Sequence, residues 1–265
     1  MLTEPRAGRL AAWGNALFAG LVPPDDAASR AVGGDTVHRV SGLPGESGQV
    51  GLTLALGRMR ALGVYGLRIA LPAPGHPLGL SGPPEFNAAA LAAGEAVVAS
   101  GAALGLVPEV NEAGPAGDVL TEVVWRCMAV RPVPPADVPS LGEAERELAE
   151  VLRDTTDALL RLDVAGAGPV ATARLDAYRA RMERGRQVLA PGYPPRAVRV
   201  LELAQRVGAL VDIAVEPDGM APGAAVSAGQ IAERDRLLRP VERAARRARV
   251  AAYNAYTEEL ERRRA

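Results

Sequence analysis

A proline-rich segment divides this sequence into two halves of different character. Residues 131–139 read Arg-Pro-Val-Pro-Pro-Ala-Asp-Val-Pro, with four prolines in nine residues. Proline fixes φ and removes a backbone donor, so this segment is expected to be extended and semi-rigid. We therefore predict a mixed α/β domain at residues 1–130, a linker at residues 131–139 and a helical bundle at residues 140–265.

The first half alternates between helical and strand-like patterns. Leu10, Trp13, Leu17 and Leu21 recur at helical spacing and predict an amphipathic helix over residues 10–22 that packs on a core. Strands and helices that alternate in this way indicate an α+β or α/β fold, in which helices cover a mixed sheet. The further predicted helices are residues 25–31, 50–62 and 85–93, and the predicted strands are residues 36–40, 65–71, 96–99, 103–110 and 119–130.

The second half shows helical patterns only. Ser140 and Glu143 form an S-x-x-E capping box at a helix start, and Ser227 and Gln230 form a second one. Between them, the periodicity predicts helices at residues 169–189 and 194–215. The last helix is expected to break or kink at Pro240. Because no strand pattern follows residue 135, we predict a bundle of four or five helices.

All 30 basic residues are arginine, which excludes chemistry that needs a lysine amine. The chain can neither form a lysine Schiff base nor supply the lysine of a P-loop. Its 48% hydrophobic and 23% charged residues are typical of a soluble globular protein, and its apolar runs predict no membrane span. The single cysteine, Cys127, cannot form an internal disulfide, so we expect a cytoplasmic protein.

The charged residues are concentrated in the second half. Residues 1–134 carry 9 arginines and 11 acids, whereas residues 135–265 carry 21 arginines and 20 acids. This near balance is typical of charged helix faces. The net charge of −1 provides no overall field that would attract nucleic acid or an anionic membrane.

The loop that runs from Pro72 to Asn87 is the most site-like segment. It follows a predicted buried strand and contains His76, Ser81, Glu85 and Asn87, of which His76 or Glu85 could act as an acid or a base and Ser81 and Asn87 could bind a ligand. Gly-Leu-Ser-Gly-Pro around Ser81 approaches the nucleophile elbow G-x-S-x-G but has proline in the last position, which disfavours a serine hydrolase. The alternative is a surface loop stiffened by proline.

Two further kinds of site are disfavoured. Gly42, Gly45, Gly48 and Gly51 could form an anion-binding nest, but they match no phosphate-binding motif, and Glu46 would repel a phosphate. A flexible connection is the preferred interpretation. The two histidines and Cys127 lack chelate spacing, so we expect neither a metal nor a cofactor.

A row of arginines at helical spacing marks the last predicted helix. Such a row can track phosphates, which makes nucleic-acid binding one alternative. Acidic residues of the first bundle helix could pair with it instead, and the opposite, alanine-rich face is suited to close helix packing or a subunit interface. The row is Arg236, Arg239, Arg243, Arg246 and Arg247; the acids are Glu143, Glu145, Glu147 and Glu150; the alanines are Ala244, Ala245, Ala248, Ala251, Ala252 and Ala255.

One stretch of sequence carries a family resemblance. Arg-Ile-Ala-Leu-Pro-Ala-Pro-Gly-His-Pro-Leu-Gly-Leu, followed by Phe-Asn-Ala-Ala-Ala-Leu-Ala-Ala-Gly-Glu-Ala, resembles uncharacterised proteins of high-GC actinobacteria. The resemblance covers about residues 10–130. It implies a type of host and no activity.

These patterns predict a non-catalytic cytoplasmic binding or adaptor protein that acts through protein–protein contacts of its helical half. Its partner would be another protein or a second copy. One alternative is a small-molecule-binding protein or an enzyme with its site in the loop at residues 72–87. A second alternative is nucleic-acid binding through the row that runs from Arg236 to Arg247.

Overall fold

The chain forms two compact units. A computed structural model describes residues 4–80, 82–115, 117–131, 137–161, 189–215 and 228–262. One unit, the sheet unit, takes in Thr3–Val138, Leu189–Pro194 and Tyr253–Ala265. The other, the helical unit, takes in Met1–Leu2, Pro139–Val188 and Pro195–Ala252. The long last helix therefore contributes residues to both units.

The sheet unit is built on six strands in the order β2-β1-β6-β5-β4-β3. β1 and β6 run parallel, and every other neighbouring pair is antiparallel. The sheet is therefore mixed, and the fold is α+β, as the sequence predicts. The strands are β1 (Val37–Ser41), β2 (Val50–Gly51), β3 (Gly66–Ala70), β4 (Ala96–Ser100), β5 (Leu104–Ala113) and β6 (Leu120–Ala129).

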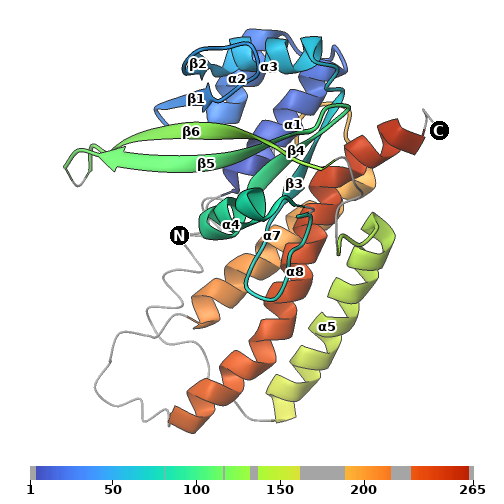
Figure 1. Cartoon of the computed structure of the whole chain (residues 1–265). Coiled ribbons are helices and arrows are strands. Elements are labelled where there is room, and N and C mark those ends of the chain that lie inside the picture. The colour runs from blue at the N-terminus through green and yellow to red at the C-terminus, as the bar shows by residue number, and fades with distance from the viewer. Residues whose placement is uncertain are drawn as a thin grey trace. The chain divides into compact units, whose positions relative to one another are not determined.

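Helices cover both faces of this sheet (Figure 1). α1 (Arg6–Phe18), α2 (Pro24–Val32) and α3 (Leu52–Ala61) lie on one face, and α1 packs against β3 and β4. α4 (Pro84–Ala93) lies on the other face and packs against β5. The alternating side chains of the strands thus meet apolar helix faces on both sides.

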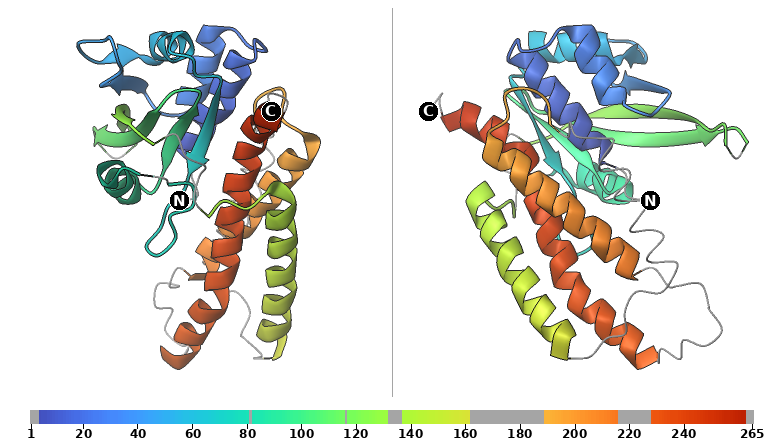
Figure 2. Two further views of the ribbon diagram at one scale, coloured as in Figure 1. Left: turned by 45° about the vertical axis from the view of Figure 1, so that its right-hand side comes forward. Right: turned by 180° about the vertical axis from the view of Figure 1, so that it is seen from behind.

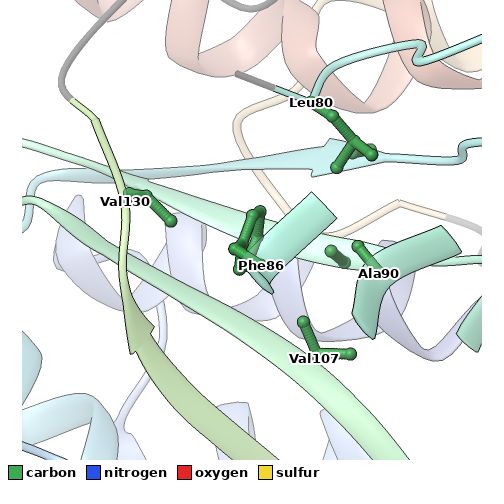
Figure 3. Packing of buried hydrophobic residues seen from close by; sticks show 7 residues of the cluster. Leu80, Phe86, Ala90, Val107 and Val130 are labelled. Carbon is green, nitrogen blue, oxygen red and sulfur yellow. The ribbon is translucent and has the colours of Figure 1, made fainter. Parts of the chain in front are cut away.

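A compact apolar cluster fixes α4 and the preceding loop to the sheet (Figure 3). Phe86 and Ala90 of α4 pack with Val107 of β5, Val130 and Leu80, the last of which belongs to the loop. A Cβ atom at position 105 would lie 2.5 Å from the Phe86 ring, so glycine is needed there. The cluster anchors one end of the loop that the sequence marks as a site.

Two asparagines from distant helices cover the outer edge of β3. Asn15 of α1 accepts a hydrogen bond from the Leu67 N–H (2.6 Å) and donates one to the Leu67 C=O (3.0 Å). Asn254 of α8 (Ala228–Arg262) makes the same pair of bonds with Ile69, at 2.7 and 3.1 Å. Each carboxamide takes the place of a neighbouring peptide group, so the edge has paired donors and acceptors.

Further contacts hold the end of α8 against β3. Thr257 donates a hydrogen bond to the Leu67 C=O at 3.0 Å, and its side chain lies so close to Gly66 that a Cβ atom there would clash. Arg68 forms ion pairs with Glu258 and Glu261. Residues 253–262 of α8 therefore belong structurally to the sheet, although the sequence places them in the bundle.

The helical unit contains three described helices that lie side by side (Figure 2). They are α5 (Leu141–Arg161), α7 (Pro195–Val215) and the part of α8 up to Ala252. The predicted capping box begins α5, since the Glu143 carboxylate accepts from the Ser140 N–H and the Ser140 hydroxyl accepts from the Glu143 N–H. The alanine face of α8 is buried, as its composition predicts.

Several elements differ from the sequence prediction. The first helix begins at Arg6 and ends at Phe18, because Gly20 adopts a positive φ of 74° and terminates it. Leu21 therefore lies beyond the helix and is half exposed. β2 was missed, being only two residues long. α8 continues through Pro240 without a break; this proline lies on the exposed face of the helix. The predicted helix at residues 169–189 and the second capping box lie essentially outside the described residues.

Replacing Asn254 with leucine should destabilise the sheet unit. The substitution leaves the buried Ile69 N–H and C=O without partners, so we expect the free energy of unfolding to fall by about 2–4 kcal/mol. Both tryptophans, Trp13 and Trp125, lie in this unit, so tryptophan fluorescence during urea unfolding monitors it selectively.

Thr257→Val is the matched control. The Leu67 C=O keeps its bond from Asn15 in this variant, so the loss should be about 1 kcal/mol or less. Equal losses in the two variants would contradict the proposed covering of the strand edge.

Candidate functional site

The loop predicted at residues 72–87 follows β3 but ends earlier than predicted, because residues 84–87 form the first turn of α4. His76 pairs with Ala73 through both backbone groups, and Leu78 and Leu80 are buried. The Asn87 side chain accepts a hydrogen bond from the Gly82 N–H at 2.9 Å, so it holds the loop together. His76 is half-buried and Glu85 is exposed.

The predicted site residues of this loop are not linked by a side-chain hydrogen bond in the described part of the chain. Ser81 lies outside the described residues. His76 contributes only its backbone to a described bond, and Glu85 lies in the first turn of α4. The assignment of an acid, a base or a ligand contact to these residues therefore stays a prediction.

A cluster of charges around Asp35 was not identified from the sequence. Arg6 donates to both carboxylate oxygens of Asp35, at 2.9 and 3.0 Å, and Arg9 donates to Oδ2 at 2.6 Å. His38 lies 3.0 Å from the same Oδ2 through its Nε2 atom. Burial would raise the pKa of Asp35, but the hydrogen bonds from Arg6 and His38 outweigh it and hold that pKa below its ordinary value.

His38 is occupied at both ring nitrogens. The Trp125 Nε1–H donates to His38 Nδ1 at 3.3 Å, so the neutral ring carries its proton on Nε2 and donates it to Asp35. Burial lowers the pKa of His38 although Asp35 opposes this shift. Asp35 thus binds Arg6, Arg9 and His38, and His38 binds Asp35 and Trp125. Because these contacts occupy both side chains, the cluster joins α1 to β1 and presents no free base.

Two buried acids flank the same cluster. Glu95 accepts a hydrogen bond from the Ala7 N–H at 2.8 Å and so caps the start of α1, where the N-cap residue is Pro5. Glu4 accepts a bond from the Tyr253 hydroxyl at 3.0 Å. Burial raises the pKa of both acids, and these hydrogen bonds offset part of that rise. The signal in the sequence that could have indicated this cluster is the spacing of Arg6 and Arg9 (R-x-x-R) and of Asp35 and His38 (D-x-x-H).

The glycine-rich segment is a turn between β1 and β2. Gly42 and Gly45 adopt positive φ, and Glu46 forms an ion pair with Arg58 at 2.6 Å. An acid in this position favours a structural turn over a phosphate site. Among the residues that the structure describes, no group of three or more His, Cys, Asp or Glu side chains could hold a metal ion.

The arginine row lies along the outer face of α8. Arg236, Arg239 and Arg243 are exposed, whereas Arg246 and Arg247 are half-buried. Arg247 donates to Glu147 of α5 at 2.9 Å, which is one of the expected internal pairs. Glu145, another of the α5 acids, pairs with Arg196 of α7 and not with the arginine row.

Arg246 differs from its neighbours. Its Nε atom is buried and finds no hydrogen-bond acceptor within the described ranges. Burial lowers the pKa of Arg246, while the nearby Glu242 opposes this shift and Arg243 adds to it. A guanidinium keeps its charge at neutral pH, so this buried Nε–H belongs to a charged group and has no hydrogen-bond acceptor among the described residues.

An open apolar depression lies where α1, α2 and α3 meet. Its volume is about 450 Å³. Leu54 on its wall is 51% exposed, and Arg60 provides its charge. The lining residues are Leu17, Pro24, Thr53, Leu54, Leu56, Gly57 and Arg60.

Comparisons with known proteins place both halves of the chain in one family. The N-terminal domain of Rv1486c-like proteins matches residues 7–138, and their C-terminal domain matches residues 142–250. The chain belongs to the Rv1486c-like family. The first match ends at residue 138 and the second begins at residue 142, so most of the segment at residues 131–139 lies within the N-terminal match.

Relatives of this Rv1486c-like chain occur in mycobacteria. The uncharacterised protein Rv1486c of Mycobacterium tuberculosis is 33% identical, over 93% of this chain and 95% of its own length. An uncharacterised protein of Mycobacterium leprae is 32% identical over 71% of this chain and 67% of its own length. No solved structure matches the chain. The actinobacterial resemblance is thus confirmed, and it brings no activity with it.

Among the described residues of this Rv1486c-like chain, no helix has both the length and the apolar character needed to cross a membrane. Both α7 and α8 are long, but charged side chains recur along them.

His38→Gln should reduce the pH dependence of stability in the sheet unit. Between its depressed pKa and about 6.5, His38 binds a proton in the unfolded chain but not in the folded one, so the free energy of unfolding rises with pH. Glutamine keeps a donor and an acceptor but does not titrate. We expect the loss of stability from about pH 7 to pH 5, measured by tryptophan fluorescence in urea, to be smaller in the variant.

Glu4 and Glu95 act in the opposite direction, because their raised pKa values lower stability as the pH rises. They are present in both proteins, so their contribution cancels in the difference. Parallel pH profiles for the two proteins would show that His38 is not the group responsible.

Proposed function

We propose that this protein is a non-catalytic binding protein that holds an acidic segment of a partner protein against the arginine row of α8. The observation that carries the proposal is the buried Nε of Arg246, which has no acceptor among the described residues. A buried donor without a partner costs about 1–3 kcal/mol, and more when its group is charged. Arg246 as a whole is half-buried, so a carboxylate from another protein could approach its guanidinium and offset this cost by compensating its charge.

The neighbouring arginines extend this surface. Arg239 and Arg243 are exposed on the same side of α8 and precede Arg246 by about two helical turns and about one helical turn, respectively. Positions 239 and 246 are separated by about 10 Å along a helix, the length of about three extended residues. Two or three acidic side chains of one segment could therefore contact the row together.

A protein is favoured over a nucleic acid as the partner. Glu242 is exposed among the arginines of the row and interrupts the continuous positive surface that a phosphate backbone needs. The chain as a whole carries a net charge of −1. A short acidic segment needs only a local positive surface, whereas a nucleic acid needs an extended one.

A non-catalytic role is supported by how the polar groups of the sheet unit are used. Asp35, His38 and Asn87 each serve as partners in hydrogen bonds that join elements of the fold. We further propose that the protein works in the cytoplasm, since its single cysteine is half-buried and burial raises the pKa of its thiol to about 11.

Binding of a ten-residue glutamate peptide tests this function. We expect the full chain to bind the peptide at low salt, and Arg243→Gln and Arg246→Gln each to weaken binding about tenfold, because each removes a charge-assisted contact. Isothermal titration calorimetry would measure the dissociation constants.

Arg199→Gln, which changes an exposed arginine of α7, is the matched control and should leave the affinity unchanged. A 20-base-pair DNA duplex serves as the competing probe. The proposal fails if the peptide does not bind at low salt, if Arg199→Gln weakens binding as much as Arg246→Gln, or if the duplex binds more tightly than the peptide.

A further inference from the structure

The β5–β6 hairpin extends beyond the rest of its sheet (Figure 1). β5 and β6 remain paired out to Ala113 and Leu120, whereas β1 pairs with β6 only at residues 122–126 and β4 pairs with β5 only at Gly105 and Leu106. The far end of the hairpin therefore has no neighbouring strand on either side in the described part of the chain. We name residues 109–115 and 117–121 the arm.

Large apolar side chains are exposed on this arm. Leu120 is 57% exposed, Val119 is 49% exposed, and Val110 is 41% exposed. Asp118, two residues before Leu120, is also exposed. The register of β5 and β6 places Val110 on the opposite face of the hairpin from Leu120, so Leu120 and Val119 provide the exposed apolar surface at the end of the arm. Exposed apolar side chains on a projecting element are typical of an interaction site.

The depression among α1, α2 and α3 has matching chemistry. Its volume of about 450 Å³ lies within the range of ligand pockets, about 300–1,000 Å³. Its walls are mainly leucine and proline side chains, and Arg60 is exposed on it. No ion pair of Arg60 or of Asp118 occurs within the described residues. An occupant with an apolar side chain beside a carboxylate would suit it.

The arm cannot be that occupant within its own molecule. In Figure 1 the β5–β6 hairpin projects sideways beyond the sheet and does not approach α3. Both β5 and β6 are fixed to the sheet at their bases by the pairing with β4 and β1, so the tip cannot turn back without breaking these pairs. A second copy of the chain does offer an arm to the depression.

We propose that two copies of this protein exchange arms: Leu120 of each copy enters the depression beside Leu54 of the other, and Asp118 pairs with Arg60. Two identical contacts related by a two-fold axis close the pair, so the assembly stops at a dimer. This surface belongs to the sheet unit and does not depend on the arginine row.

Sedimentation equilibrium of the full chain and two charged variants tests the exchange. We expect the native chain to be a dimer, and Leu120→Asp and Leu54→Asp each to weaken association by about tenfold or more, because a charge replaces a buried leucine. Both leucines are exposed in the single chain, so the variants should fold. Leu91→Asp, on the exposed side of α4, is the matched control and should leave the dimer intact.

Mixing the two variants distinguishes exchanged arms from a different interface. A mixture of Leu120→Asp and Leu54→Asp contains one intact arm and one intact depression, so it should form a mixed dimer that neither variant forms alone. Likewise, Asp118→Arg and Arg60→Asp should each weaken the dimer, and the double variant should recover it. A native monomer at all concentrations, or a mixture that stays monomeric, would overturn the proposal.

Discussion

The outer edge of β3 is the point on which the architecture of the sheet unit depends. An edge strand has unpaired peptide groups that would otherwise pair with another chain. Here two carboxamides, from Asn15 and Asn254, pair with alternate residues of the strand. A third buried side chain, Tyr193, donates to the Tyr253 C=O and accepts from Asn15, so the two helices are joined through one hydrogen-bond chain.

This arrangement explains why every residue of β3 except the half-buried Arg68 is buried although the strand lies at the edge of the sheet. Its burial pattern is that of a central strand, since helices cover its faces and its free side. Covering by side chains demands close approach, and glycines at positions 8, 14 and 66 provide the space next to Tyr253, Leu67 and Thr257. Any larger residue at these positions would separate the helices from the strand. The packing of the helices around β3 thus depends on these three glycines and on the side-chain amides of Asn15 and Asn254.

Much of the fold could be predicted from local patterns. The S-x-x-E motif at Ser140 identified the start of α5, and the alanines of α8 identified its buried face, because both signals lie within a few residues of what they determine. The covering of β3 could not be predicted. Asn254 looks like an ordinary polar residue in a helix, and its partner Ile69 is 185 positions away.

The candidate site, too, could be predicted only where its residues lie close together in the sequence. The sequence drew attention to His76, Glu85 and Asn87 because they are close along the chain, whereas the structure unites Arg6, Arg9, Asp35 and His38 from separate elements. The arginine row was visible from its spacing, but the buried Nε of Arg246 depends on neighbouring helices that periodicity does not place.

The long sequence separation between β3 and its covering helix also affects synthesis. At about 5–20 residues per second, a ribosome needs roughly 10–40 s to add the residues that follow Ile69 up to Asn254. During that interval the nascent chain contains a complete β3 whose edge still lacks its last partner. The covering of this edge therefore has to wait until Asn254 has been synthesised.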